Sequence, residues 1–245
     1  MAEKPAALVT GAGRRIGAGL ARHLAARGYA VVLHHNDSAE GAARIAAEIA
    51  GSGGTAHVLQ ADLGDADAVE ALIPAAFDLA PGLSLLVNNA ARFVHDRVES
   101  LTRANWDAHL AVNLSAPAFL AKAFADALSA RQRPGLIVNI TDFKLSGRPD
   151  PAFLSYTVAK AGLAALTELL AVALAPRGIR VVAIAPGFTL PGGKQSDESF
   201  AEAFHAAPLG AGSTIADLAR ALGFAIDSPA LTGCTLPIDG GMHLV

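Results

Sequence analysis

The sequence predicts an α/β fold in which one parallel sheet, doubly wound, carries helices on both faces. Short apolar runs alternate with longer segments of helical periodicity along the whole chain. Such alternation is typical of a parallel sheet with right-handed crossovers. The 245 residues contain no repeat, low-complexity tract or charged linker. We therefore expect a single domain over residues 1–245, because α/β folds of this length are often undivided.

The composition argues against several classes of protein. Hydrophobic residues make up 52% of the chain and charged residues 17%, which is not the balance of a disordered protein. The net charge of -3 lacks the basic surplus of a nucleic-acid-binding protein. Cys234 is the only cysteine, so no internal disulfide is expected. The start, MAEKPAALVTG, lacks the apolar run of a signal peptide, and Thr167 and Glu168 interrupt the best candidate for a membrane span. We expect a cytoplasmic protein with a small-molecule substrate, no nucleic-acid or membrane partner and no metal site.

The first part of the chain reads as four strands separated by three helices. The strands are short apolar runs, as buried parallel strands require, and the first ends in Thr10-Gly11-Ala12-Gly13. The helices have helical periodicity, and the first two stop at glycine. The strands are expected at Ala6–Val9, Ala30–Leu33, Ala56–Gln60 and Leu83–Val87, and the helices at Ile16–Arg27, Ala39–Ala50 and Asp65–Ala80.

The second part continues the alternation. Residues Asn105–Ala130 have helical character, although Pro117 should disturb one turn. The remaining strands are expected at Gly135–Ile140, Arg180–Ile184 and Thr235–Ile238, and the remaining helices at Phe153–Pro176 and Ala216–Ile226. The one long irregular stretch, Thr189–Ser199, is rich in Gly, Pro and Ser, and we expect a substrate lid near residues 187–215.

In open α/β sheets, ligands bind beyond the carboxyl ends of the strands. The chemistry of this chain should therefore lie in the loops that follow its predicted strands. These loops are Thr10–Gly17, His34–Ser38, Asp62–Leu63, Asn88–Phe93, Thr141–Pro151 and Pro186–Ser199.

Tyr156 and Lys160 stand four residues apart in the longest predicted helix. This spacing places the phenol and the ammonium on one helix face. A nearby positive charge favours phenolate, so we expect Lys160 to lower the pKa of Tyr156. A phenol with a lowered pKa is a usable proton donor and acceptor near neutral pH.

The loop Thr10–Gly17 is a glycine turn before a helix, and after a first strand this predicts dinucleotide binding. Asp62 could accept from an adenine amino group or cap the helix that starts near Asp65. The amides of Asn88-Asn89-Ala90 could hold a loop or face a cofactor. Asn113 could bind backbone or water at the turn disturbed by Pro117.

The set TGAGRRIG, ADL, NNA, Asn113, YxxxK and IAPG, in this order and spacing, resembles the short-chain dehydrogenase/reductase family, and the match extends to Ile238-Asp239-Gly240-Gly241. The resemblance implies a Rossmann-like domain, a nicotinamide cofactor and usually a homotetramer. It also implies that Tyr156 donates or accepts the proton, that Lys160 holds the nicotinamide ribose, and that Asn113 holds a water of the proton relay. The cofactor-binding residues that it implies are Gly11, Arg14, Arg15, Ile16, Gly17, Ser38, Asp62, Leu63, Asn89, Ala90, Lys160, Pro186 and Gly187.

Two residues depart from the family pattern. Arg15 stands where the family usually has a further glycine. Phe143 stands thirteen residues before Tyr156, where the family has its catalytic serine, and a phenyl ring cannot donate or accept a hydrogen bond. One inserted residue within Gly147–Pro151 would place Asp142 in the serine's position; Ser146 is the rival candidate.

These departures resemble the pteridine reductase branch of the family. That branch has arginine after a basic residue in the turn, as in Arg14-Arg15, and an aspartate in place of the serine, as Asp142 would be. It also has an aromatic residue three positions after NNA that stacks on the pterin, where this chain has Phe93. The resemblance thus implies substrate contacts from Arg15, Phe93, Asp142 and Tyr156, with Arg15 reaching either the pterin or the cofactor phosphates. Phe93 could instead pack on the lid.

The sequence favours NADPH and leaves NADH possible. Arg14 is the kind of cation that pairs with a 2′-phosphate, and Ser38 could add a hydrogen bond. Asp37 would repel a phosphate, unless it caps the helix that begins near Ala39.

Three functions remain open. The first is an NADPH-dependent reductase of a pterin-like ring such as a dihydropterin or dihydrofolate. The second is an NAD(P)-dependent oxidoreductase of a carbonyl or alcohol, such as a 3-oxoacyl group or a sugar. The third, a non-catalytic dinucleotide-binding protein, is disfavoured by the intact Tyr156–Lys160 pair.

Overall fold

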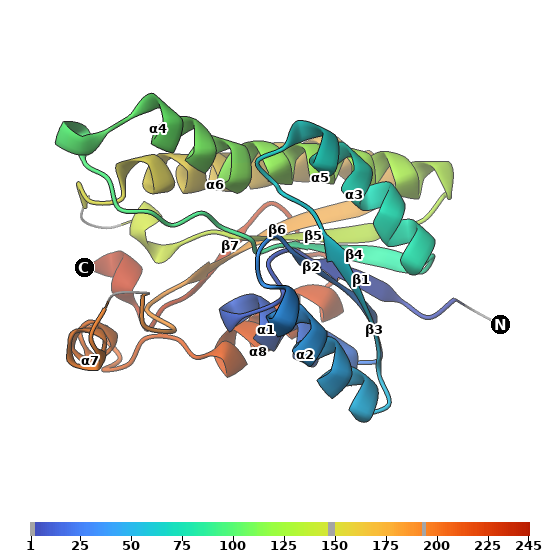
Figure 1. The fold of residues 1–245 in the computed structure, drawn as a ribbon, viewed down its shortest axis with the longest axis horizontal. Coiled ribbons are helices and arrows are strands. Elements are labelled where there is room, and N and C mark those ends of the chain that lie inside the picture. The colour runs from blue at the N-terminus through green and yellow to red at the C-terminus, as the bar shows by residue number, and fades with distance from the viewer. Residues whose placement is uncertain (1–2, 147–149, 193–194) are drawn as a thin grey trace.

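A computed structural model describes residues 3–146, 150–192 and 195–245 of the chain (Figure 1). Its seven strands form one parallel sheet in the order β3-β2-β1-β4-β5-β6-β7, which confirms the predicted fold class. The strands are β1 (Ala6–Val9), β2 (Ala30–His35), β3 (Thr55–Gln60), β4 (Leu83–Asn88), β5 (Gly135–Ile140), β6 (Ile179–Pro186) and β7 (Thr235–Ile238). The α-helices are α1 (Arg15–Ala26), α2 (Ala39–Gly51), α3 (Ala66–Leu79), α4 (Arg103–Leu110), α5 (Ala116–Ala130), α6 (Leu154–Leu174), α7 (Asp197–His205) and α8 (Ile215–Asp227).

Helices cover both faces of the sheet. Helices α3, α5 and α6 pack on one face and α1, α2 and α8 on the other, and Figure 1 shows the two layers above and below the strands. Strand β1 shows why both layers bury apolar residues: Ala6 and Leu8 belong to one core cluster, and Ala7 and Val9 to the other. Alternate residues of a strand point to opposite faces, so a strand buried on both sides is apolar throughout.

The predicted helix Asn105–Ala130 is in fact two helices joined by a wider turn. Residues Ala111–Ser115 form a π-helical turn, in which the N–H of Ala116 bonds to the carbonyl of Ala111. The disturbance lies just before Pro117 rather than at it. A proline has no N–H and its ring clashes with the carbonyl four residues earlier, here that of Asn113, so the preceding turn widens.

Helix α7 was not predicted. The stretch expected to be irregular through Ser199 becomes helical at Asp197. Ser196 caps this helix by accepting from the N–H of Ser199, and Asp197 and Glu198 occupy the first turn. A serine cap followed by acidic residues stabilises a helix start. The other predicted elements agree with the structure within two residues at their ends.

The strand order reverses between β1 and β4, so the loops after these two strands lie side by side. The Thr10 hydroxyl joins them by accepting from the backbone N–H groups of Asn89 and Ala90, at 2.9 and 3.0 Å. The glycine turn after β1 and the NNA segment after β4 therefore form one unit.

Candidate active site

The glycine turn is shaped by close backbone contacts. Gly11 has a φ of 65°, a left-handed conformation that glycine adopts without strain. A Cβ on Gly17 would collide with the carbonyl oxygen of Gly11 and lie 2.5 Å from Asn89 Nδ2. That same Nδ2 donates to the carbonyl of Thr10 at 2.8 Å. Asn89 therefore holds the turn, and Ala90 lies beside it.

The start of α1 has the character of an anion site. Arg14 is the N-cap and makes no side-chain capping bond, and the first turn has no acidic residue. Ile16 and Gly17 lie in this first turn, whose N–H groups have no intrahelical partner. An uncapped helix N-terminus with free N–H groups and a positive dipole end fits a pyrophosphate.

Arg15 lies between the glycine turn and the lid region. Its φ is 54°, the left-handed conformation for which glycine is suited, so an arginine is strained here. Its guanidinium donates to the carbonyls of Pro191 and Leu190 at 2.7 and 3.2 Å. In this structure Arg15 thus ties the turn to the segment that follows β6.

The side chains that would distinguish NADPH from NADH, by contact with the 2′-phosphate, lie close together. Arg14 Nη2 is 3.6 Å from Asp37 Oδ1, and both side chains are mostly exposed. Asp37 does not cap α2, because the N-cap is Ser38, whose side chain makes no capping bond either. Ser38 packs against the turn so closely that a Cβ on Gly13 would collide with its Oγ.

The other predicted cofactor residues lie at the same edge of the sheet. Asp62 is exposed and accepts from the N–H of Gly64 at 2.8 Å. The alternative role as a helix cap is wrong for Asp62, because Asp65 caps α3. Leu63 is buried in the core. Pro186 ends β6, and the N–H of Gly187 donates to the carbonyl of Ile238 at 2.9 Å.

His34 links the glycine turn to the end of β3, a role that was not predicted from the sequence. Its Nδ1 accepts from the N–H of Gly11 at 3.1 Å, so Nε2 carries the proton and donates to the carbonyl of Ala61 at 3.1 Å. Burial lowers the pKa of His34 to about 4, which keeps the ring neutral. The only signal in the sequence was a histidine at the end of an apolar strand.

His34 makes stability depend on pH. Its folded pKa of about 4 lies below the ordinary histidine value of 6.5, so the unfolded chain binds more protons between these values. The free energy of unfolding should therefore fall as the pH drops from 6.5 to 4, by about 3 kcal/mol at ~1.4 kcal/mol per pKa unit. Urea unfolding of wild type and His34→Gln at pH 7 and pH 5 checks this. An equal loss on acidification in both proteins would show that His34 is not responsible.

Tyr156 and Asp142 meet in the structure. The phenol of Tyr156, in the first turn of α6, donates to Asp142 Oδ2 at 2.7 Å, and Asp142 Oδ1 accepts from the N–H of Lys144 at 2.9 Å. The rival Ser146 is exposed, and its N–H bonds to the carbonyl of Phe143. The predicted insertion within 147–151 falls largely outside the described residues, which resume at Asp150.

The predicted lowering of the Tyr156 pKa is wrong for this structure. Burial, and then the charge of Asp142 and the hydrogen bond to it, raise the pKa of Tyr156 well above its ordinary value. Burial likewise raises the pKa of Asp142. The carboxylate is in contact with the phenol, whereas Lys160 Nζ lies 5.8 Å from the centre of the ring. The nearer negative charge therefore outweighs the ammonium.

Lys160 is 2% exposed and donates to the carbonyl of Ile140 at 2.5 Å. Burial lowers the pKa of Lys160 to about 8, with Asp142 opposing the shift. The ammonium thus lies under the tyrosine, held by the end of β5.

Asn113 is fully buried at the π-helical turn and holds backbone. Its Oδ1 accepts from the N–H of Arg92 at 2.8 Å, and its Nδ2 donates to the carbonyl of Arg92 at 2.9 Å. One turn earlier, His109 Nε2 accepts from the N–H of Val94 at 3.2 Å. Both side chains therefore fix the loop that carries Phe93.

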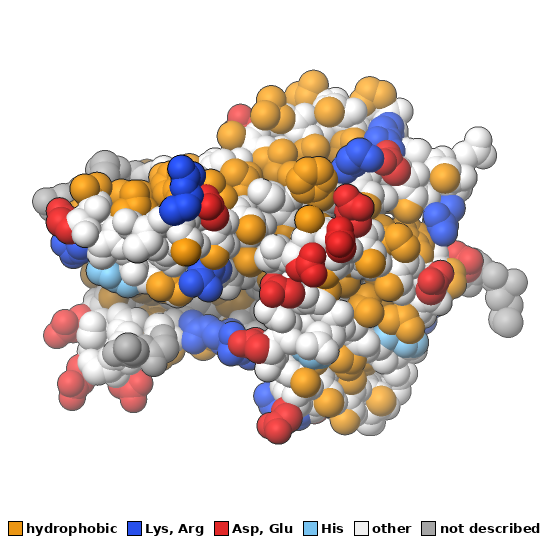
Figure 2. Space-filling view, turned by 45° about the horizontal axis from the view of Figure 1, so that its top comes forward, with side chains coloured by type: hydrophobic (Ala, Val, Ile, Leu, Met, Phe, Trp, Pro, Cys, Tyr) orange, Lys and Arg blue, Asp and Glu red, His pale blue; other side chains and the backbone are white. Residues whose placement is uncertain are grey.

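Phe93 is 51% exposed and belongs to an aromatic group beside the phenol. Its ring stacks on Phe153 with centroids 4.3 Å apart and meets the ring of Tyr156 edge-on at 4.7 Å. Lys144 Nζ lies 5.4 Å from the centre of the Phe153 ring. Figure 2 shows a hollow between the parts that carry α4 and α7, with basic side chains at its inner end.

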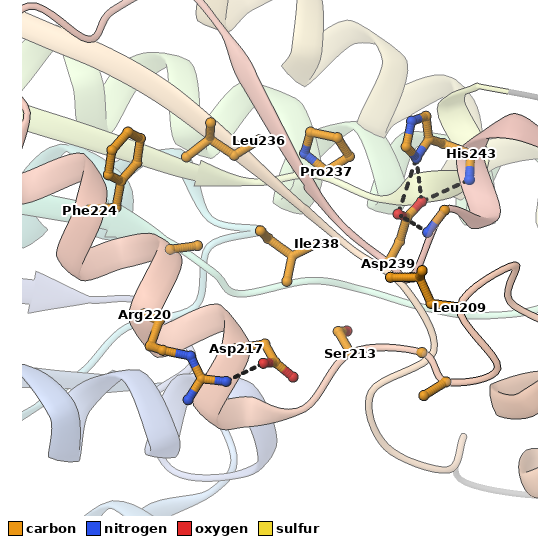
Figure 3. A pocket seen from close by; sticks show the side chains of 15 residues that line it. Leu209, Ser213, Asp217, Arg220, Phe224, Leu236, Pro237, Ile238, Asp239 and His243 are labelled. Carbon is orange, nitrogen blue, oxygen red and sulfur yellow. Dashed lines mark hydrogen bonds and ion pairs between the residues drawn. The ribbon is translucent and has the colours of Figure 1, made fainter.

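A separate cavity of about 680 Å³ lies between α8, β7 and the C-terminal segment (Figure 3). Its charged side chains are already paired: Asp239 with His243 at 2.8 Å, and Asp217 with Arg220. We place no chemistry there. Within the described ranges 3–146, 150–192 and 195–245, no three His, Cys, Asp or Glu side chains come together as a metal site would need.

Comparisons with known proteins find similar proteins over nearly the whole chain. The family model described as enoyl-(acyl carrier protein) reductase matches residues 11–243. A 3-oxoacyl-(acyl-carrier-protein) reductase from Synechocystis sp. is 35% identical over 96% of both chains. A 3beta-hydroxysteroid dehydrogenase 1 from Eggerthella lenta is 34% identical over 97% of this chain and 93% of the relative. The crystal structure of FolM alternative dihydrofolate reductase 1 from Brucella suis, in complex with NADP, has a TM-score of 0.93 and 41% identity, covering 98% of this chain and 96% of that one.

Proposed function

Because the chain belongs to the short-chain dehydrogenase/reductase family, we propose that it is an NADPH-dependent reductase of a pterin-like ring, a dihydropterin or dihydrofolate. The observation that carries the proposal is the hydrogen bond between Tyr156 and Asp142. In the family pattern a serine accompanies the tyrosine, and a carboxylate beside a developing alkoxide would repel it. A carboxylate suits a ring that presents N–H donors, as a pterin does.

The cofactor is proposed to lie on the glycine turn. The free N–H groups of Ile16 and Gly17 would face the pyrophosphate, Arg14 the 2′-phosphate, and Lys160 the nicotinamide ribose. Asp62 would face the adenine. NADPH supplies the hydride when bound. A solved structure with 41% identity is described as a complex with NADP, which supports this choice.

The chain's own residues manage the proton. With its raised pKa, Tyr156 stays protonated at neutral pH and so holds the proton that a nitrogen would take as its carbon gains hydride. Lys160, close below the ring, would stabilise the phenolate that remains. Asp142 accepts a hydrogen bond from the phenol, so its carboxylate is a second group that can carry the proton. Asn113 is proposed to hold the water of the relay through its backbone, since its side chain holds Arg92.

Phe93 is proposed to stack on the pterin with the face that Phe153 leaves free. Arg15 would reach the substrate or the cofactor phosphates after releasing Leu190 and Pro191. The lid would comprise residues near 187–215, including α7; residues 193–194 of this range lie outside the described residues.

The competing candidate is a carbonyl or alcohol oxidoreductase. The relatives at 34–35% identity are described as a 3-oxoacyl reductase and a hydroxysteroid dehydrogenase, which act on such groups. The solved structure at 41% identity is described as a dihydrofolate reductase, and this favours the pterin ring.

A substrate panel separates the two candidates. Dihydrobiopterin, dihydrofolate, folate and simple ketones are tried with NADPH and with NADH. We expect NADPH-dependent reduction of a dihydropterin, impaired in both Asp142→Ser and Phe93→Ala. Asp142→Ser restores a hydroxyl pair and should shift the ratio of rates toward the ketone. If a ketone is reduced while no pterin binds or is reduced, the pterin proposal is rejected and the carbonyl reductase is supported.

We also propose a homotetramer in the cytoplasm. Two exposed apolar surfaces lie on different sides of the sheet: one on α5 and α6, with Phe119, Leu169 and Val172, and one near α8 and the C-terminus, with Phe224 and Leu244. A symmetric tetramer needs at least two self-complementary surfaces. Figure 2 shows hydrophobic side chains gathered over the upper helix layer. A lone cysteine suits a reducing compartment.

Helix α6 with the turn after it, Leu154–Arg177, is also long and apolar enough to cross a membrane, with a mean hydropathy of 1.8. The core helix of a soluble protein passes the same test, and Ala159, Leu163 and Ala171 on this helix are buried. The apolar residues on its outer side are those we assign to a partner subunit.

The assembly has a direct test. At micromolar concentration the mass in solution should be four times that of the chain, and Val172→Glu should reduce it. Val172 is 79% exposed, so the glutamate costs the monomer little but places charge in a buried interface. A monomeric wild-type mass would defeat the proposal.

A further inference from the structure

We propose that Asp96, in the loop between β4 and α4, is a positioning residue that caps helix α6 from outside and thereby holds Tyr156 in place. The proposal rests on the proposed function only in taking Tyr156 as the proton donor.

Helix α6 has no cap of its own. Its N-cap residue, Phe153, has a left-handed backbone with a φ of 59° and no side chain that can accept a hydrogen bond. The first N–H groups of a helix have no intrahelical partner and need an acceptor from elsewhere. The turn left without a cap is the one that contains Tyr156.

Asp96 supplies the missing acceptors. Its backbone carbonyl accepts from the N–H of Leu154 at 3.4 Å, and its Oδ1 accepts from the N–H of Ser155 at 3.1 Å. Its Oδ2 accepts from the hydroxyl of Ser155. The first two residues of α6 are therefore both bonded to Asp96, and the second directly precedes Tyr156.

The carboxylate is 1% exposed. Burial opposes its charge, but the hydrogen bonds from Ser155 and Asn105 hold the pKa of Asp96 below its ordinary value. Asp96 is thus ionised at neutral pH, and a negative charge at a helix N-terminus is stabilised by the helix dipole.

The same carboxylate holds the substrate side of the site. Its Oδ2 also accepts from Asn105 Nδ2 on α4 at 3.0 Å. Three residues before it in the same loop is Phe93, whose ring meets the ring of Tyr156. One buried charge therefore joins three parts: the loop of Phe93, helix α4 and the first turn of α6.

Removing the Asp96 carboxylate should lower turnover rather than weaken cofactor binding. A misplacement of about 1 Å can cost about 10²-fold in rate. In Asp96→Ala the N–H and the hydroxyl of Ser155 lose their acceptor, so we expect kcat for the dihydropterin to fall about 10- to 100-fold. The Kd of NADPH should stay unchanged, because Asp96 bonds to Leu154, Ser155 and Asn105, none of which is proposed to bind the cofactor. Asp96→Asn keeps an acceptor for Ser155 and should recover most of the rate.

The matched control is Asp126→Ala. Asp126, on α5, accepts from Lys122 and from Arg177, just beyond the opposite end of α6. This variant removes a carboxylate that supports the same helix, but far from Tyr156, and should keep the wild-type kcat.

A second readout needs no substrate. The chain has two tyrosines, Tyr29 and Tyr156, so in a Tyr29→Phe background the alkaline tyrosinate absorbance reports Tyr156 alone. The pKa of Tyr156 is raised by burial and by Asp142. In Asp96→Ala it should move toward its ordinary value, because a frayed turn exposes the phenol and separates it from Asp142.

The outcomes separate this proposal from the proposed function. If Asp96→Ala shifts the Tyr156 titration while the wild-type protein reduces no pterin, the role of Asp96 is supported and the pterin substrate is rejected. Wild-type kcat and an unchanged titration in folded Asp96→Ala would overturn the role of Asp96. Should Asp96→Ala not fold, Ser155→Ala, which removes one of the bonds, is expected to move both quantities in the same direction, and unchanged values there would also overturn it.

Discussion

Replacing Tyr156 with phenylalanine is expected to lower turnover by about 10²-fold or more, the usual scale for general acid catalysis. The variant keeps the ring that contacts Phe93 and removes only the hydroxyl that donates to Asp142. The fold and the cofactor site should therefore be intact, and loss of rate would report the missing proton. The measurement is kcat at saturating NADPH and substrate, together with the Kd of NADPH.

Turnover of Tyr156→Phe close to the wild-type value would remove Tyr156 from the mechanism. A loss of NADPH binding as well as of rate would instead assign the hydroxyl a part in holding the site together.

Replacing Arg14 with alanine is expected to weaken NADPH binding about 10- to 100-fold, because a charge-assisted hydrogen bond contributes ~1.5–3 kcal/mol. The affinity for NADH should change little. In the free protein the partner of Arg14 is Asp37, at 3.6 Å and mostly exposed, and such a pair is worth only about 0–1 kcal/mol. A 2′-phosphate should therefore displace Asp37 readily. The measurement is the Kd of each cofactor.

Asp37→Asn is the matched variant for this site. It removes the negative charge that competes for Arg14 and repels a phosphate, so NADPH should bind more tightly. Equal losses for both cofactors in Arg14→Ala would show that Arg14 only supports the turn or the shared pyrophosphate.

The fold was predictable because each element has a local signal. A strand buried on both faces is apolar throughout, as β1 is with its sequence AALV. Helix α7 escaped prediction because its nine residues include no buried side chain and only one pair of large apolar residues at helical spacing, Phe200 and Phe204. Its serine cap and acidic first turn were further local signals.

The sequence was enough to predict which residues form the site, but not the pKa shifts of those residues. Sequence spacing placed Tyr156 and Lys160 on one face, and the pairing of Asp142 with Tyr156 depended on a loop of uncertain register. The direction of the Tyr156 pKa shift depends first on the burial of the phenol and then on its contact with Asp142, and sequence spacing decides neither. His34 and Asp96 were missed for a similar reason: each bonds to backbone groups that are distant in sequence.

The strand order has a consequence for how the protein folds. Strand β1 is made first, yet it lies in the middle of the sheet, where Ala7 pairs with Leu85 of β4. Contacts between residues so far apart in sequence require a large loop to close, and sheets built from them fold slowly. Until β4 arrives, one edge of β1 stays unpaired, and exposed strand edges favour aggregation. The glycine turn also lacks Asn89 until that moment. The nascent chain therefore cannot acquire nucleotide affinity before β4 has been synthesised and docked, and a bound nucleotide would stabilise the central pairing only after the slowest contact has formed.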